Sequence, residues 1–307
     1  MLFAERPVLQ VALLENRLVI GRGDRRRGDP DERAEVVDVA PSGMHAPAWQ
    51  PAVAALSNWL REHDLKRARL HVYLSSQLVR WQLLEWQPQL VRPQELEAYA
   101  RLRFRATFGT VADSWRVVHT EPLPGRALPA CAIDETLLAE LDSLQGIGET
   151  SVASVVPYFS AAFDRWRSSV GQKMAWFGVA EPGSLTLGLL HRGVWHGLRS
   201  ARHTDPSGAG WRSVLPALQA QIQLASGSDL SKEPPTVYLV GCGAEAERAR
   251  DPRLVWLALP AQPRWGRGAG AAAGPGAAHL AARYGDHRQS RPALAGRAVR
   301  SPGGPGP

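Results

Sequence analysis

The sequence lacks the features that carry a chain into or through a membrane. Its first residues, MLFAERPVLQVALLENRL, hold no basic segment followed by an apolar core and a small-residue cleavage site, as a signal peptide would. No run approaches the roughly 18 to 20 consecutive apolar residues that cross a bilayer. We therefore expect a cytoplasmic protein, which would need a partner to hold it at a membrane.

Cysteine is scarce, since the 307 residues include only Cys131 and Cys242. Both lie in or beside apolar, strand-like runs (LPACAI and VYLVGCG), which favours buried free thiols and leaves a redox pair as the alternative. The nine histidines are scattered, and none stands at metal-ligand spacing from another histidine or from a cysteine. We expect neither a disulfide framework nor a metal site.

Net charge is nearly absent from most of the chain. Seven Arg and one Asp give residues 261–307 a charge of +6, which leaves about +1 of the formal +7 for residues 1–260. Ala, Gly, Pro and Arg make up 35 of the 47 residues in this segment, so it has little apolar bulk to bury. We expect a disordered, solvated tail, with loose RNA or lipid binding or a shifted reading frame as alternatives. The near-neutral body predicts no specific nucleic-acid partner.

Familiar catalytic motifs are missing as well. The sequence contains no Gly-x-Ser-x-Gly elbow and no Walker loop. His63, Asp64 and His71 are close together in the sequence, but no nucleophile lies near them. We interpret these three side chains as solvated, and we predict no catalytic residues.

What the sequence does contain is one order of elements used twice. Each half has three strand-like runs followed by helix, strand, helix and strand, with extra material at about 78–121 in the first half. The expected strands are 8–14, 17–23, 34–40, 69–75, 78–86, 115–121, 127–133, 150–157, 173–180, 184–191, 194–202, 233–243 and 252–260. The expected helices are 49–64, 93–109, 134–146, 158–170, 210–226 (interrupted at Pro216) and 244–251.

This order predicts an α/β fold. Three antiparallel strands followed by alternating helices and strands form one mixed sheet with helices on its faces. Two such units side by side make an actin-like protein, in which each half resembles ribonuclease H. We expect the first half at 1–156, with an inserted subdomain at about 78–121, the second half at 157–260, and the disordered tail at 261–307.

The residues also resemble a known family. The order of elements, the linker SVVPYFSAAFDRWR and the run VYLVGCGAE are similar to those of bacterial actin-like assembly proteins of the PilM type and of the cytoplasmic domain of type II secretion protein L. The resemblance implies a cytoplasmic platform component of a type IV pilus or type II secretion-like machine. It also implies binding to the cytoplasmic segment of an inner-membrane bitopic partner of the PilN type, peripheral membrane association, and a homo-oligomer or ring as an open alternative.

The pilus members of this family bind ATP through two hairpins that each read Asp-x-Gly followed by hydroxyl residues, so the equivalent turns decide whether nucleotide binding is expected. The first turn here has Glu15, Asn16 and Arg17, with no glycine and no hydroxyl. In the second turn, Gly183 and Ser184 could serve a phosphate, but the preceding proline removes an N–H donor. A plain Pro-Gly turn is the favoured interpretation.

A third nucleotide-binding element, after the two turns, would follow the strand VYLV. Gly241 and Gly243 fall where the family's adenosine-contacting glycines lie, but tight packing of the strand end explains them equally well. With one of three elements plausible, we expect a non-enzymatic protein without a cofactor. The alternative is an ATP-binding actin-like ATPase or a divergent sugar-kinase-like enzyme.

Tryptophan is abundant, with eleven residues. We expect Trp59, Trp166 and Trp176 to pack in the core. Trp81 and Trp86 lie in the extra segment, where an aromatic side chain could anchor a partner peptide or form the core of a small subdomain. Because Trp86 stands at the strand end beside an exposed loop, we predict it as the partner-binding residue.

Overall fold

The computed structural model describes residues 7–23, 34–43, 46–63, 65, 67–170, 173–205, 210–227, 234–241 and 254–257. Several predictions lie outside these residues: the disordered tail, the short helix at 244–251, Cys242 and Gly243.

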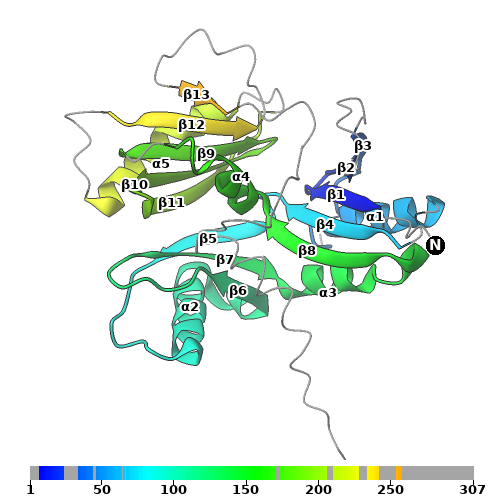
Figure 1. Ribbon diagram of the computed structural model, residues 1–307, viewed down its shortest axis with the longest axis horizontal. Helices are drawn as coiled ribbons and strands as arrows, with labels where there is room; N and C mark the ends of the chain where they lie inside the picture. Colours follow the sequence, from blue (N-terminus) through cyan, green and yellow to red (C-terminus); the bar gives the residue numbers. More distant parts are fainter. Residues whose placement is uncertain are drawn as a thin grey trace, which may run out of the picture.

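The first half is built on a five-stranded sheet with the order β3-β2-β1-β4-β8. Its strands are β1 (Val8–Leu13), β2 (Arg17–Gly23), β3 (Glu35–Asp38), β4 (Arg69–Leu74) and β8 (Ser151–Pro157). The first three form an antiparallel meander, and β4 and β8 join parallel to β1. Helices α1 (Gln50–Glu62) and α3 (Glu135–Ser143) pack together beside the sheet (Figure 1).

The second half repeats this arrangement. Its strands are β9 (Ala175–Glu181), β10 (Ser184–His191), β11 (Val194–Arg202), β12 (Thr236–Gly241) and β13 (Leu254–Trp256). The order is β11-β10-β9-β12-β13. Strands β9, β10 and β11 form an antiparallel meander, β12 pairs parallel with β9, and β13 pairs parallel with β12. The same third-second-first-fourth-fifth order in both sheets confirms the predicted α/β, two-half, actin-like architecture.

An inserted subdomain interrupts the first half between β4 and α3. It contains β5 (Val79–Leu84), α2 (Pro93–Phe108), the 3-10 helix η1 (Gly109–Ser114), β6 (Trp115–His119) and β7 (Leu128–Asp134). The three strands form an antiparallel sheet with β7 in the middle, covered by the apolar face of α2. Because β7 pairs with both neighbours, this subdomain continues to Asp134, whereas the predicted segment of about 78–121 contains β5, α2, η1 and β6 but not β7.

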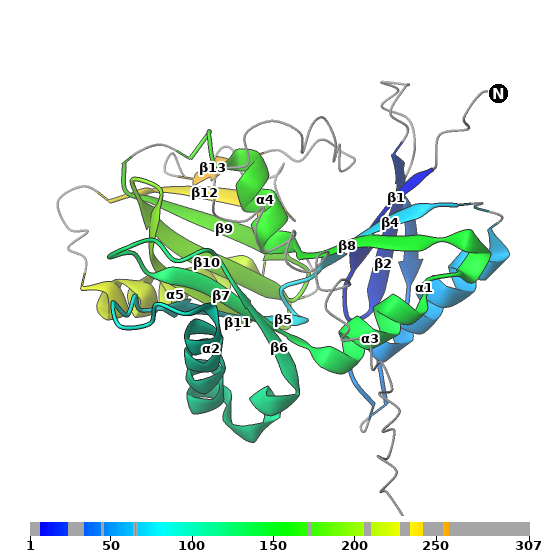
Figure 2. The same ribbon diagram turned by 60° about the horizontal axis from the view of Figure 1, so that its bottom comes forward.

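One continuous apolar core joins the halves. Helix α4 (Tyr158–Trp166) leads from β8 into the second half, and its Phe159 packs edge-on against Trp81 of the insertion and Phe177 of β9, at ring-centroid distances of 5.3 and 5.5 Å. Strand β5 also lies against β11 (Figure 2). Trp59 and Trp176 are buried and Trp166 packs against the core, as predicted.

Helix α5 (Trp211–Ser226) corrects one detail of the sequence interpretation. It continues through Pro216 as a single helix, so the predicted interruption is wrong. The helix buries Trp211, Leu218 and Ile222 on both sides of the proline, and it packs against β10 and β11. This packing on either side compensates for the hydrogen bond that proline removes. Among the described helices, none is long and apolar enough to cross a membrane.

Candidate functional site: the junction between the two hairpin turns

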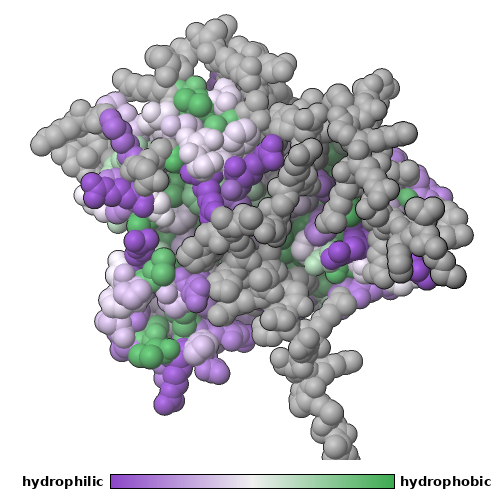
Figure 3. All heavy atoms as spheres, in the orientation of Figure 1, coloured by the Kyte–Doolittle hydropathy of each residue, from purple (hydrophilic) through white to green (hydrophobic). Residues whose placement is uncertain are grey.

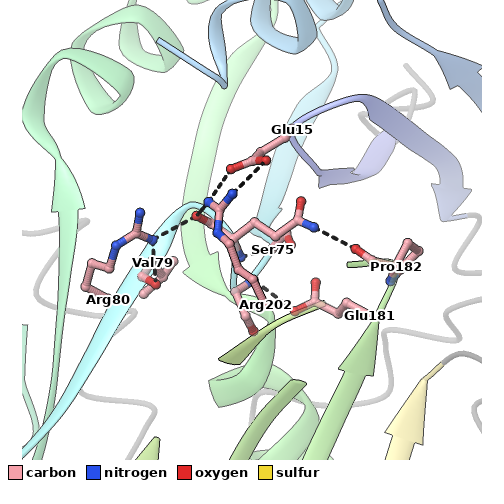
Figure 4. A network of polar contacts seen from close by, with 9 residues as sticks. Glu15, Ser75, Val79, Arg80, Glu181, Pro182 and Arg202 are labelled. Carbon is pink, nitrogen blue, oxygen red and sulfur yellow. Dashed lines mark hydrogen bonds and ion pairs between the residues drawn. The ribbon is translucent and has the colours of Figure 1, made fainter. Parts of the chain in front are cut away.

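The candidate site lies where the carboxyl ends of the central strands meet. The β1–β2 turn, the loop 75–78 that follows β4, and the β9–β10 turn all lie at such ends and approach one another across the two halves (Figure 4). In open α/β sheets, ligands bind at the carboxyl ends of strands. This is therefore the place where an actin-like fold would hold a nucleotide, and the side chains found here decide what it can hold.

An ion pair connects the first hairpin to the last residue of β11. Both guanidinium nitrogens of Arg202 donate to the carboxylate of Glu15, Nη1 to Oε2 at 3.2 Å and Nη2 to Oε1. The Glu15 side chain is 22% exposed and that of Arg202 is 56% exposed. A two-pronged arginine–carboxylate pair of this kind fixes geometry as well as adding energy. The pair joins residues 187 positions apart and so ties one half to the other.

The backbone carbonyl of Gln77 collects a second pair of contacts. It accepts from Nη2 of Arg202 at 3.0 Å and from Nη1 of Arg80 at 2.8 Å. Burial lowers the pKa of the Arg80 guanidinium, the charge of Arg202 lowers it further, and Glu15 opposes both effects. Two positive side chains and one negative side chain thus share this end of the junction.

The side chain of Gln77 fills the second hairpin turn. Its Nε2 donates to the carbonyl of Pro182 at 2.6 Å. Gly183 has a φ of +80°, and a side chain added there would lie 2.6 Å from the same nitrogen. The N–H of His203 donates to the Gly183 carbonyl at 3.0 Å. The positive φ of the turn explains glycine at position 183, and a side chain there would also displace the Gln77 amide.

Glu181 closes the junction from the second half. Its carboxylate is buried and accepts the backbone N–H of Ser76 at 2.9 Å. Burial raises the pKa of Glu181, while hydrogen bonding to Ser76 and Ser75 opposes the rise. Several other polar atoms here are buried and have no hydrogen-bond partner among the described residues: Oγ of Ser184, Oε1 of Gln77 and both ring nitrogens of His203.

The structure brings three of the four predicted cofactor-binding residues together and leaves their role untested. Gly183 and Ser184 lie in the second turn, and Gly241 pairs with Ala180 at the end of β12. Gly241 has a φ of +116°, and a side chain there would overlap the carbonyl oxygen of Ala180. Close approach of β12 to β9 is thus sufficient to explain this glycine.

Sequence reasoning missed the residues that make most of the contacts here. Nothing in the sequence marks Gln77 as a functional residue, because glutamine is common in loops. Glu15 was noticed only as a departure from the family's glycine, and the sequence offered no means of pairing it with Arg202. In the described part of the chain, no three His, Cys, Asp or Glu side chains are grouped so as to hold a metal ion.

The predicted partner residue lies elsewhere, on the inserted subdomain. Trp86 follows β5 and is 36% exposed, whereas Trp81 is buried against Phe159. Five of the eight large apolar side chains that are exposed among the described residues belong to this subdomain: Trp86, Val91, Leu102, Val111 and Leu123. Figure 3 shows apolar surface at the lower left, over the region that carries α2 in Figure 1.

Comparison with known proteins adds distant likenesses. No protein-family model and no curated protein sequence matches the chain. Among solved structures, the cytoplasmic domain of EpsL, an inner membrane component of the type II secretion system of Vibrio cholerae, is 13% identical, with 76% of this chain and 81% of that chain covered and a TM-score of 0.46.

Two further solved structures are similar to the same degree. A PilM–PilN type IV pilus biogenesis complex is 16% identical (76% and 81% covered, TM-score 0.49). A Bacteroides thetaiotaomicron protein with an actin-like ATPase fold and unknown function is 12% identical (78% and 84% covered, TM-score 0.48). These likenesses are modest, and the assignment of an actin-like fold rests on the strand order that both halves share.

Proposed function

We propose that this chain is a non-enzymatic, cytoplasmic assembly component of a type IV pilus or type II secretion-like machine. In this role it binds the cytoplasmic segment of an inner-membrane bitopic protein of the PilN type and is held at the membrane through that partner. The observation that supports the non-enzymatic part is that the chain's own side chains occupy the junction: Glu15 of the first turn pairs with Arg202, and Gln77 donates to Pro182 of the second turn.

The chemistry of the junction supports this proposal. Phosphate groups are held by backbone N–H donors and positive charge, but the second turn contains Pro182, which has no N–H. The Glu15 carboxylate opposes a polyphosphate at the end of the junction that also holds Arg80 and Arg202. Arg202 already has a carboxylate partner in Glu15, so a phosphate would have to displace it. These features support a junction without an ATP triphosphate.

The assignment to a pilus or secretion machine rests on the resemblance of the element order, the linker and the run VYLVGCGAE, and the partner type follows from the same resemblance. Within the chain, Trp86 supports a peptide anchor because it is aromatic, exposed and on the same subdomain as four other exposed apolar side chains. Aromatic anchors of this kind carry much of the energy of protein interfaces.

The test is binding to a synthetic peptide that covers the cytoplasmic segment of a small bitopic protein encoded beside this chain. Trp86→Ala should reduce binding at least tenfold, which corresponds to about 1.4 kcal/mol, and should leave Tm within a few degrees. The matched control is Leu224→Ala, because Leu224 is 86% exposed on α5 of the second half. Equal binding by wild type and Trp86→Ala would contradict the anchor assignment.

Calorimetry with Mg-ATP tests the non-enzymatic part separately. We expect no binding at micromolar ATP, because Gln77, Arg80 and Arg202 already donate to groups of the chain itself and Pro182 offers no N–H. Micromolar affinity would instead favour the ATPase or sugar-kinase alternative.

A further inference from the structure

The contacts across the junction form one connected set. Arg202 of β11 reaches the first hairpin through Glu15 and the loop after β4 through the carbonyl of Gln77. The same loop reaches back into the second half, because Gln77 donates to Pro182 and Ser76 donates to Glu181. Every one of these contacts joins the first half to the second.

We propose that Glu15, Gln77 and Arg202 form a built-in latch, which fixes the second half against the first half and the inserted subdomain without any ligand. In the actin-like arrangement the two hairpins face each other, and here the chain's own carboxylate and amide lie between them. The latch is a conformational device, and it stands independently of the partner and of the machine proposed above.

The place of the latch explains what it controls. Arg202 is the last residue of β11, and Gln77 lies two residues before β5. Strands β11 and β5 lie against each other, so the latch sits at one end of the contact between the second half and the inserted subdomain. Holding that end fixes how the subdomain, with its exposed apolar side chains, is placed relative to the second half.

The carboxylate of the latch is less exposed than the carboxylates of the other ion pairs among the described residues, while Arg202 is 56% exposed. Glu15 is 22% exposed, whereas Arg67 and Glu149, which pair at 3.2 Å within the first half, are 71% and 66% exposed. A single-pronged pair in full contact with water contributes little. A forked pair that is partly withdrawn from water and also donates to a backbone carbonyl is held more firmly.

Hydrogen–deuterium exchange of the full chain tests the latch. When the latch opens locally, the backbone amides that it protects exchange with solvent. The most direct reporter of this opening is the N–H of Ser76, which donates to Glu181 across the junction. We expect Glu15→Gln and Arg202→Gln each to raise exchange about tenfold in peptides that cover residues 75–80. The matched control, Arg67→Gln, should leave these peptides unchanged.

The double variant makes the test decisive. If Glu15 and Arg202 act through each other, the double variant Glu15→Gln/Arg202→Gln should exchange no faster than the more affected single variant. Arg202→Lys, which keeps the charge but loses the fork, should fall between wild type and Arg202→Gln. Unchanged exchange in both single variants, additive effects in the double variant, or an equal rise throughout the chain would each overturn the latch.

Discussion

Replacing Gly241 by alanine separates a packing role for the end of β12 from a ligand-binding role. Gly241 has a φ of +116°, and in the parallel pairing of β12 with β9 it lies opposite Ala180. A Cβ at this position would overlap the carbonyl oxygen of Ala180 and lie 3.0 Å from its carbonyl carbon. Both atoms belong to the backbone of a buried strand, so they cannot move aside as a flexible side chain would.

The magnitude follows from two costs. A non-glycine residue in a sparsely populated backbone region costs about 1–3 kcal/mol, and forcing an extra methyl group into a packed site costs about 1–3 kcal/mol more. The smaller entropy of the unfolded alanine chain returns about 0.4–1 kcal/mol. We expect a net loss of about 1–6 kcal/mol, and at roughly 2–4 °C per kcal/mol for a domain of about 150–250 residues, a fall in Tm on the order of 2–20 °C.

Gly193→Ala is the matched control. Gly193 also has a positive φ, +74°, but a Cβ there would meet no atom within 4 Å. Only the backbone cost applies, so we expect a loss of about 1 kcal/mol or less. Thermal and urea denaturation of the two variants measure the difference. If Gly241→Ala is as stable as Gly193→Ala, the close approach of β12 to β9 is not the reason for glycine at position 241. That result would favour the interpretation of Gly241 as an adenosine contact.

Two further predictions concern the buried carboxyl and the tail. Because burial raises the pKa of Glu181 above its ordinary value of 4.5, the folded state holds this proton more tightly than the unfolded state, and stability should fall as the pH rises through the interval above 4.5. Glu181→Gln keeps an acceptor for Ser76 and should flatten this pH dependence of the free energy of unfolding, measured by urea titrations between pH 4 and 8. Asp164→Asn is the control, because burial raises the pKa of Asp164 to about 6. It should remove only the pH dependence of stability between about pH 4 and 6. A chain ending at Pro260 should melt cooperatively at about the full-length Tm, because the composition beyond it offers little to bury; loss of cooperative unfolding would show that the tail is structural.

The order of elements could be predicted because each element has its own local signal. The runs VLQVALL and RLVIGRG around a short polar turn predict a hairpin, and β1 and β2 pair as expected. The expected helix at 134–146 begins at Asp134, whose side chain accepts the N–H of Thr136 as a helix cap does. Repetition of that order then gives the two halves without any knowledge of long-range contacts.

Pairing between distant segments could not be predicted in the same way. Strand β7 reads as an ordinary apolar run, and nothing local indicates that it lies between β5 and β6. The junction shows the same limit more strongly, since Gln77 and Arg202 are 125 residues apart. Polar side chains in loops carry no periodic pattern, so their partners emerge only when the fold places them together.

A latch made by the chain itself changes what a partner can do to this protein. A ligand shifts a conformational equilibrium only as far as its affinities for the two states differ. If Arg202 and Glu15 hold one arrangement without a ligand, no nucleotide is needed to set it, and the exposed apolar side chains of the inserted subdomain are presented in a fixed position. A partner peptide that binds there then acts on β5, and through the contact of β5 with β11, on the latch itself. Exchange of the Ser76 amide with and without the peptide would measure that coupling, and unchanged exchange would show that the peptide does not act on the latch.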